Sequence, residues 1–218
     1  VACFYSATMA WNPTAVDTRV KILEEVREGL QREQFIPYYQ PKVSLRTGQI
    51  VGFEALARWQ HPEKGLLTPG SFSPAFHDPE RAVAIGSTMM RCVMQDLRAW
   101  LDKGWDCGRI AINLASAEFA DADLAKKLLA QLAAAGVPPS SFEVEVTETV
   151  FLERQSEIAM TILRELSHAG VSVALDDFGT GYASLTHLKR YPVHHIKIDQ
   201  SFIRDLETDR EDAAIVSA

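Results

Sequence analysis

Hydrophobic residues along the chain follow two different periods, and the segments with each period alternate from about residue 19 onward. Some segments repeat an apolar residue every three or four positions, which is the spacing of one helix face. Others alternate apolar and polar residues, or stay apolar for a few positions, as strands do. Helices are predicted within 20–30, 90–101, 124–132 and 158–166, and strands at 35–45, 50–59, 109–114, 142–148, 171–177 and 194–199.

Turn and cap residues divide these segments. Asp17 or Thr18 is a candidate N-cap for the first helix, and the Pro- and Gly-rich stretch 61–74 is predicted to be a loop. The segment "RTGQ" at 46–49 is short enough for a hairpin, so the first two strands are expected to be antiparallel. The later strands alternate with helices, which is the order of βαβ units in a parallel sheet. The sequence therefore predicts an α/β fold with an antiparallel first pair.

Polar residues recur near the end of each strand. In "FEVEVTE", Val144 and Val146 lie on one face while Glu143 and Glu145 lie on the other, and "HHIKID" alternates in the same way. Strands of a parallel sheet covered on both faces are normally apolar throughout. Active sites of α/β barrels are built at the carboxyl ends of the strands, so a shared polar mouth is expected there. Its members would be Glu54, Arg58, Asn113, Glu145, Asp176, Asp177, Lys197 and Asp199.

The candidate ligands in this set are hard oxygen donors. Carboxylate and amide oxygens, with no Cys or His in ligand spacing, favour Mg²⁺ or Mn²⁺ over zinc. Asp176 and Asp177 are adjacent, so one carboxylate could bridge two ions, as in two-metal phosphodiester hydrolysis. Lys197 is a candidate for holding the attacking water or offsetting negative charge, and Arg58 is a candidate for a bidentate phosphate contact.

Each of these residues also has an ordinary interpretation. A single glutamate near a strand end is often a surface or salt-bridged residue, and "DD" before a glycine turn is often Asx-turn chemistry. The alternation in 142–148 is also typical of an antiparallel strand with one solvated face. His194 and His195 are expected to be ordinary, with no metal between them. The pattern alone leaves a metal site and a structural polar edge both open.

Composition limits the partners. The chain has 218 residues, is 47% hydrophobic and 23% charged, and carries a net charge of −7, which argues against a nucleic-acid polymer or an anionic membrane as partner. Cys3, Cys92 and Cys107 lack metal-type spacing and are interpreted as reduced thiols of a cytoplasmic protein. No apolar run approaches the ~20 residues of a membrane helix. Both ends look cut from a longer protein, whose membrane anchorage stays open.

Six motifs, in order, resemble those of EAL domains, the bacterial phosphodiesterases that open cyclic di-GMP to linear pGpG. The resemblance covers residues 19–218, and the opening residues 1–18 are similar to a linker or to the end of a diguanylate-cyclase-type GGDEF domain. It implies cyclic di-GMP as partner, GGDEF or sensor domains upstream, and a homodimer. The motifs are "YQPKV", "GFEALARWQHPEKG", "INLA", "EVEVTET", "DDFGTGYASLTHLKRYPV" and "IKIDQSFI".

The resemblance implies a role for each matching residue. Lys197 matches the active-site lysine, and Glu148 matches the glutamate that steadies the "DDFGTGYASL" loop, which in the family also supports dimerisation. The implied cofactor is one or two ions of Mg²⁺ or Mn²⁺. The implied metal ligands are Glu54, Asn113, Glu145 and Asp176, with Asp177 serving the second ion, and the implied substrate contacts are Gln40, Arg58 and Asp199.

The implied fold is a modified TIM (β/α)8 barrel with an antiparallel first strand, in agreement with the predicted hairpin. Three departures leave the ligands in place: Ala115 stands where Ser is frequent, "FHDPERA" replaces the usual "AEETG", and His194 stands where Asp is frequent. The family continues into a seventh and an eighth strand. This chain stops before both, so the EAL domain in 19–218 is expected to be C-terminally incomplete.

Two functions compete on this basis. The first is a metal-dependent phosphodiesterase that hydrolyses cyclic di-GMP. The alternative is a non-catalytic receptor or scaffold that binds the dinucleotide, but degenerate EAL domains of that kind have usually lost the EAL glutamate or other ligands, and all visible ligands are present here. An enolase-type barrel also carries acids and a lysine on successive strands, yet it needs a large N-terminal capping domain for which the chain has no room.

Overall fold

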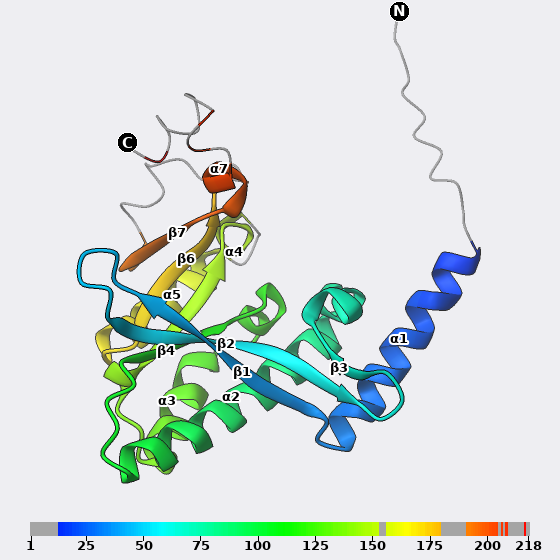
Figure 1. Ribbon diagram of the computed structural model, residues 1–218, viewed down its shortest axis with the longest axis horizontal. Coiled ribbons are helices and arrows are strands. Elements are labelled where there is room, and N and C mark those ends of the chain that lie inside the picture. Colours follow the sequence, from blue (N-terminus) through cyan, green and yellow to red (C-terminus); the bar gives the residue numbers. More distant parts are fainter. Residues whose placement is uncertain are drawn as a thin grey trace, which may run out of the picture.

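The computed structural model describes residues 13–152, 156–179 and 191–204, together with 206, 208 and 216. One mixed sheet runs through these residues, with helices packed against it (Figure 1). The helices are α1 Pro13–Gln31, α2 Pro79–Asp102, α3 Leu124–Ala135, α4 Thr149–Leu152, α5 Ser156–His168 and α7 Gln200–Arg204, with 3-10 helices η1 Pro69–His77, η2 Ser116–Ala120 and η3 Pro139–Ser141. The strands are β1 Phe35–Val43, β2 Ile50–His61, β3 Gly65–Leu67, β4 Arg109–Asn113, β5 Phe142–Thr147, β6 Ser172–Phe178 and β7 His195–Ile198.

The strand order is β1-β2-β4-β5-β6-β7, with the short β3 beside β2. β1 and β2 form an antiparallel hairpin in which Gln40 lies opposite Glu54. Gly48 in the connecting turn has φ 69°, a conformation that glycine adopts without strain. From β2 to β7, neighbouring strands on this path are parallel. The predicted α/β fold with an antiparallel first pair is therefore confirmed.

The outward face of the parallel strands forms the core with the helices. On β5, Val144 and Val146 are at most 1% exposed, and on β6 Val173 and Leu175 are fully buried. Burying an aliphatic side chain of this size is worth about 1.5–3 kcal/mol. Because successive strand residues point to opposite faces, this burial turns the intervening glutamates of β5 toward the inside of the curved sheet. The hydrophobic core thereby fixes the orientation of the polar residues.

Two boundaries predicted from the sequence were wrong. α1 begins at Pro13, so Asp17 and Thr18 lie within the helix and do not cap it. Proline suits a first helical position because its missing N–H has no partner there in any case. The stretch 61–74, predicted as a loop, contains β3, which pairs with the end of β2, and most of η1. By contrast, Gly136 ends α3 in the left-handed conformation, with φ 64°, as its position predicted.

The sheet has two ends, β1 and β7, and no strand among the described residues joins them. Ile196 and Ile198 of β7 are 46% and 37% exposed, so this strand is covered less than β5 or β6. This open order, six strands along one path, is the arrangement that the sequence predicted.

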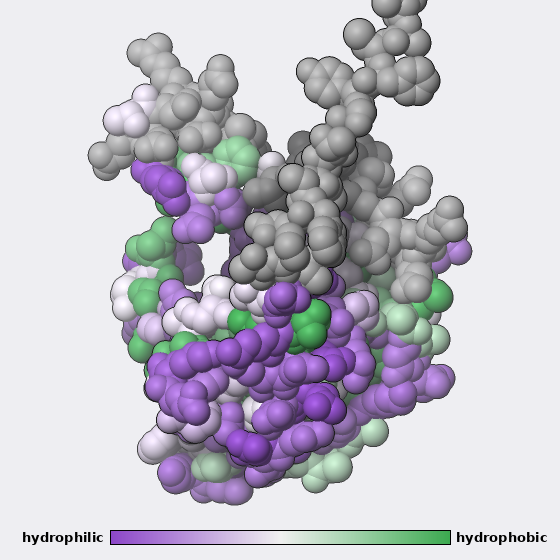
Figure 2. Space-filling view, turned by 90° about the vertical axis from the view of Figure 1, so that its right-hand side faces the viewer, coloured by the Kyte–Doolittle hydropathy of each residue, from purple (hydrophilic) through white to green (hydrophobic). Residues whose placement is uncertain are grey.

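Hydrophilic side chains predominate on the described surface that faces the viewer in Figure 2. Within the described ranges, the helices lack the combination of length and apolar character that crossing a membrane requires.

Candidate metal centre

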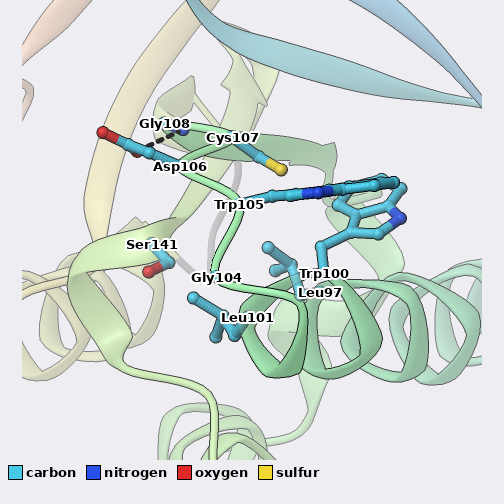
Figure 3. Close-up of a pocket in the computed structure, with 9 residues that line it drawn as sticks. All are labelled: Leu97, Trp100, Leu101, Gly104, Trp105, Asp106, Cys107, Gly108 and Ser141. Atoms are coloured by element: carbon cyan, nitrogen blue, oxygen red, sulfur yellow. Dashed lines mark hydrogen bonds between the residues drawn. The ribbon is translucent and has the colours of Figure 1, made fainter.

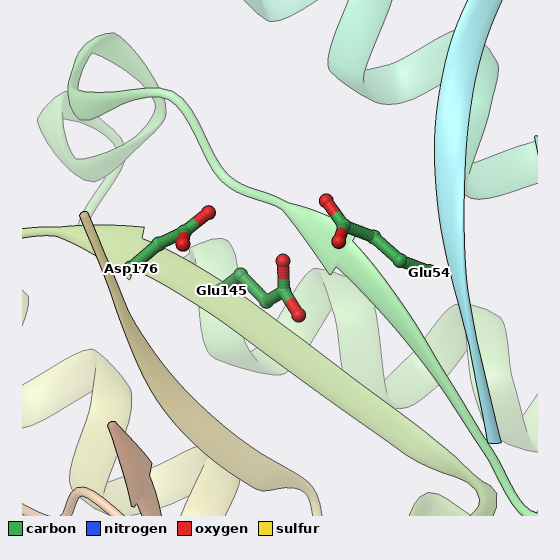
Figure 4. A group of neighbouring side chains, drawn as sticks. All are labelled: Glu54, Glu145 and Asp176. Atoms are coloured by element: carbon green, nitrogen blue, oxygen red, sulfur yellow. The ribbon is translucent and has the colours of Figure 1, made fainter. Parts of the chain in front are cut away.

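Three carboxylates converge at the carboxyl ends of the parallel strands. Glu54 comes from β2, Glu145 from β5 and Asp176 from β6, and one oxygen of each lies within 4.8 Å of the others. Figure 4 shows the three side chains pointing toward a common space. Glu145 is fully buried, and the side chains of Glu54 and Asp176 are each 17% exposed. Three negative charges in so small and dry a space require a cation.

Lys197 of β7 supplies that cation in this structure. Its Nζ lies 3.1 Å from Glu54 Oε2, 2.6 Å from Glu145 Oε2 and 3.0 Å from Asp176 Oδ2. We call Glu54, Glu145, Asp176 and Lys197 the mouth cluster. Four strands contribute one charged side chain each, although the residues span 143 positions of the chain. The sequence predicted all four as site residues, and the structure brings them together.

The protonation equilibria of the mouth cluster reflect its burial. Burial raises the pKa of Glu145 to about 7, although the hydrogen bond and charge of Lys197 oppose the rise. Burial also acts to raise the pKa of Glu54, but Lys197 and the hydrogen bond from Asn113 lower it below its ordinary value. For Lys197, burial acts to lower the pKa, and its contacts with Glu145, Asp176 and Glu54 raise it overall. Such shifts are typical of functional sites.

Two amide side chains stand beside the mouth cluster. Asn113, at the end of β4, donates from Nδ2 to Glu54 Oε1 at 3.1 Å. It lies opposite Glu145 in the register of β4 and β5, so its side chain lies beside the carboxylates. Gln40 lies opposite Glu54 in the β1–β2 register and is exposed. Both residues are therefore next to the carboxylates, as the sequence predicted.

Asp177 lies near the end of β6, and Glu148 contacts the backbone that follows this strand. Asp177 has φ 52°, and its N–H donates to Asp176 Oδ1 at 3.0 Å. Burial, followed by the charges of Asp176 and Asp199, raises the pKa of Asp177. Glu148 is 4% exposed, and its Oε1 accepts from the N–H of Gly179 at 2.9 Å. Glu148 thus contacts the start of the loop that it was predicted to steady; residues 180–190 of that loop lie outside the described residues.

Arg58 and Asp199 make other contacts. The Nη1 of Arg58 donates to the carbonyl of Ala57 at 2.9 Å, and its guanidinium lies 5.5 Å from the centre of the Tyr38 ring. Asp199 accepts from the N–H of Ser201 at 2.8 Å at the start of α7. The hydrogen bonds with Ser201 lower the pKa of Asp199. Neither residue takes part in the charge contacts of the mouth cluster.

The structure also shows charged residues that sequence reasoning did not assign to the site. Lys42 of β1 contacts Glu143 and Glu145, and His195 of β7 contacts Glu143. Lys42 was within the quoted motif "YQPKV", two positions from Gln40 and thus on the same face of β1. This alternation along β1 was the sequence signal that could have assigned Lys42 to the site. Of the two histidines expected to be ordinary, His194 accepts at Nδ1 from the N–H of Val173 at 3.0 Å, whereas His195 contacts the buried Glu143.

A separate pocket of about 310 Å³ lies at the other end of the strands, and we call it the amino-end pocket (Figure 3). It is formed by the end of α2 and the segment leading into β4. Trp105 on its rim is 55% exposed, and Asp106 accepts from the N–H of Gly108 at 3.1 Å. It contains none of the predicted site residues. Its lining is Leu97, Trp100, Leu101, Gly104, Trp105, Asp106, Cys107, Gly108 and Ser141.

A parallel sheet with an antiparallel first strand, and an acid-rich centre at its carboxyl ends, defines the class of protein as an α/β fold with a candidate metal site. The EAL domain family model matches residues 23–218, and the chain belongs to this family. EAL domains have a TIM-barrel-like fold, as the sequence predicted. The phosphodiesterase MucR, solved in complex with cyclic di-GMP, superposes with a TM-score of 0.83 at 42% identity, over 90% of this chain and 79% of that one.

Two curated relatives extend the comparison. The chain is 40% identical over 216 residues to the bifunctional diguanylate cyclase/cyclic di-GMP phosphodiesterase MucR of Pseudomonas aeruginosa, covering 99% of this chain and 31% of the relative. It is 35% identical over 193 residues to the cyclic di-GMP phosphodiesterase PdeR of Escherichia coli, covering 88% and 29%. The chain therefore spans about a third of the length of these relatives.

Proposed function

We propose that this chain is the phosphodiesterase domain of a bacterial second-messenger protein and that it hydrolyses cyclic di-GMP to linear pGpG with the help of Mg²⁺ or Mn²⁺. The observation that carries the proposal is the mouth cluster, in which oxygens of Glu54, Glu145 and Asp176 lie within 4.8 Å of one another. The family and the names of its phosphodiesterase members support the choice of substrate.

The donor set fits a hard divalent cation. Glu54, Glu145 and Asp176 offer carboxylate oxygens, and no Cys or His belongs to this group within the described part of the chain. Asn113 already contacts Glu54, and rotation of its amide would direct its oxygen to the same space. Asp177 would serve a second ion. When bound, the ions would lower the pKa of a coordinated water and offset negative charge on the phosphate.

Lys197 has the position of an active-site ammonium. Its Nζ contacts all three carboxylates, so it lies where their negative charges converge. Beside a bound ion, the same ammonium would orient the attacking water or stabilise the developing charge on a phosphate oxygen. Glu148 would keep the chain after Asp177 in place through the N–H of Gly179.

The proposed substrate contacts are chosen from where Gln40, Arg58 and Asp199 lie relative to the carboxylates. Gln40 is exposed beside Glu54, and Arg58 follows Glu54 by four residues on the same face of β2. Arg58 would exchange its contact with the Ala57 carbonyl for a phosphate, the stronger and bidentate partner. Asp199, at the start of α7, would contact a base or ribose through the carboxylate oxygen that does not cap the helix.

The domain boundaries, the oligomeric state and the cellular location are also proposed. Residues 1–18 would be a linker or the end of a GGDEF-like domain, since the name of MucR includes a diguanylate cyclase activity. Residues 19–218 would be the EAL domain and would form a homodimer as family members do. The free Cys92 and Cys107 suit a cytoplasmic location.

The test is incubation of the chain with cyclic di-GMP and Mg²⁺ or Mn²⁺, with the nucleotides separated by chromatography. Formation of linear pGpG that stops on chelation is the expected result. Binding of the dinucleotide without pGpG in any metal would overturn the proposal in favour of a receptor or scaffold.

A further inference from the structure

A second charged layer lies beneath the mouth cluster inside the curved sheet. Lys42 Nζ is 2.5 Å from Glu143 Oε1, and His195 Nδ1 is 3.0 Å from Glu143 Oε2. Ser172 Oγ lies 3.4 Å from the same histidine nitrogen. We call Lys42, Glu143, Ser172 and His195 the floor cluster. Because β1, β5 and β7 are not neighbours in the sheet, its contacts cross the interior from one strand to another.

Lys42 also connects the floor to the mouth. Its Nζ lies 3.4 Å from Oε1 of Glu145, while Lys197 holds Oε2 of the same carboxylate at 2.6 Å. Glu145 is fully buried, and each of its two oxygens contacts a different lysine. An ionised carboxylate at such a depth is stable only when its charge and lone pairs are satisfied.

Lys42 also contacts Glu143, a second buried carboxylate. Glu143 and Glu145 are two residues apart on the same face of β5, and their side chains are 5% and 0% exposed. Two buried carboxylates so close repel each other unless a cation lies between them. Burial acts to raise the pKa of Glu143, and the hydrogen bond and charge of Lys42 lower it below its ordinary value.

The two lysines differ in what a metal ion would do to them. Lys197 touches the three carboxylates that would hold the ion, so an ion in the mouth cluster competes with its ammonium for the same oxygens. Lys42 reaches Glu145 from below and makes no ion pair with Glu54 or Asp176 among the described contacts. An ion in the mouth cluster would therefore compete with Lys197 and leave the contacts of Lys42 in place.

We propose that Lys42 is a positioning residue of the metal centre, which holds Glu145 from the floor so that its other oxygen stays directed at the ion. The inference rests on the proposed function, because it assigns a role toward the same metal. Lys42 does not touch the ion or the substrate; it acts through Glu145, as a hydrogen-bonded partner orients a metal ligand. Its ammonium also keeps Glu143 and Glu145 from repelling each other out of position.

The experiment measures Mn²⁺ binding to the chain directly, by titration calorimetry and by the loss of the free-ion electron paramagnetic resonance signal. Lys42→Met removes the charge and keeps the length of the side chain. It should weaken Mn²⁺ binding by about 10–100-fold, the usual effect of removing a partner that orients a ligand. Lys42→Arg, which keeps the charge and can reach both carboxylates, should bind within about tenfold of the unaltered chain.

Lys64→Met is the matched control, because Lys64 pairs with Glu25 on the surface at 2.7 Å, away from the mouth cluster. Circular dichroism shows whether each variant is folded, and if Lys42→Met is not, Lys42→Gln takes its place under the same criterion. Unchanged Mn²⁺ affinity in the folded Lys42 variant, or an equal loss in Lys64→Met, would overturn the role of Lys42 alone. Absence of Mn²⁺ binding by the unaltered chain would overturn the proposed function and this inference with it.

Discussion

The two ends of the parallel strands offer two concave regions with opposite character. At the carboxyl ends, Lys197 lies within 3.1 Å of three carboxylates, one of them fully buried. At the amino ends, the amino-end pocket is lined mainly by Trp100, Trp105 and leucines, and its one carboxylate, Asp106, contacts its own loop. Trp105 there is half exposed, and the Lys103 ammonium lies over its ring, 4.9 Å from the ring centre.

The difference teaches that a cavity alone does not locate a function. Apolar side chains around a surface pocket cost the fold little, whereas several buried charges cost it several kcal/mol each unless they are paired. Charges that converge despite this cost are held together by the rest of the structure, and their perturbed pKa values follow from it. We therefore propose the carboxyl-end region as the functional site, and the amino-end pocket serves as an internal comparison.

The largest expected effect belongs to the mouth cluster. Glu54→Gln keeps the shape of the side chain but removes one ligand charge, so hydrolysis of cyclic di-GMP should fall by about 1,000-fold or more, equivalent to several kcal/mol of transition-state stabilisation. Stability should fall modestly, because glutamine loses the ion pair with Lys197 that lowers the pKa of Glu54. Glu63→Gln, at an exposed position, is the control, and near-normal turnover by Glu54→Gln would exclude the metal assignment.

Glu118 should make the stability of the chain depend on pH. It is 5% exposed, accepts from the N–H of Ala115 at 2.8 Å just after β4, and burial raises its pKa from 4.5 to about 7. The folded chain binds more protons than the unfolded chain between these values, so stability falls as the pH rises through this window. Glu118→Gln should avoid that loss and be more stable than the unaltered chain at pH 8 by up to about 3 kcal/mol.

Urea unfolding at pH 5 and pH 8 measures this difference. The advantage of Glu118→Gln should shrink toward pH 5, where the carboxyl group of the folded chain is protonated. Parallel pH profiles for the two proteins would show that Glu118 does not carry the predicted charge penalty.

Arg58 tests whether the carboxyl-end region has substrate contacts that are separate from its metal ligands. Arg58→Ala should weaken cyclic di-GMP binding by about 1.5–3 kcal/mol, the value of a charge-assisted hydrogen bond, and leave Mn²⁺ binding unchanged. Calorimetry with each ligand separates the two effects, and Arg46→Ala in the β1–β2 turn is the exposed control. A fall in Mn²⁺ affinity as large as the fall in dinucleotide affinity would make Arg58 a structural residue.

A local effect is expected at Glu148. Glu148→Ala removes the acceptor of the Gly179 N–H, so hydrogen exchange of that amide should accelerate while β5 and β6 stay protected. Glu157→Ala on the surface of α5 provides the reference. Unchanged exchange at Gly179 would argue against the role of Glu148 in steadying the chain after β6.

The smallest effect is expected in the amino-end pocket. Trp105→Ala should leave cyclic di-GMP hydrolysis and Mn²⁺ affinity unchanged and lower stability by no more than about 1 kcal/mol, because the ring is 55% exposed. A clear loss of hydrolysis or of Mn²⁺ affinity in folded Trp105→Ala would contradict the comparison and give the amino-end pocket a part in catalysis.

Much of the fold was predictable because local periods are physical constraints on single elements. The alternation in "FEVEVTE" predicted that β5 would bury its valines and turn its glutamates inward, and the structure confirms it. The turn at 46–49 predicted the hairpin of β1 and β2. The predictions failed where capping residues proved not to be caps, at Asp17 and Thr18, since a helix continues through a good cap when the preceding residues are helical too.

The sequence by itself determined the order of the elements, the inward face of each strand, and the hard oxygen chemistry of Glu54, Glu145 and Asp176. Only the tertiary structure decided which charges meet. Lys42 and Glu143 are 101 residues apart and join across the interior, whereas Arg58, four residues from Glu54, turns to the Ala57 carbonyl and Tyr38. Spacing along a strand fixes the face on which a side chain lies, but the register, tilt and curvature of the whole sheet fix the distances between faces.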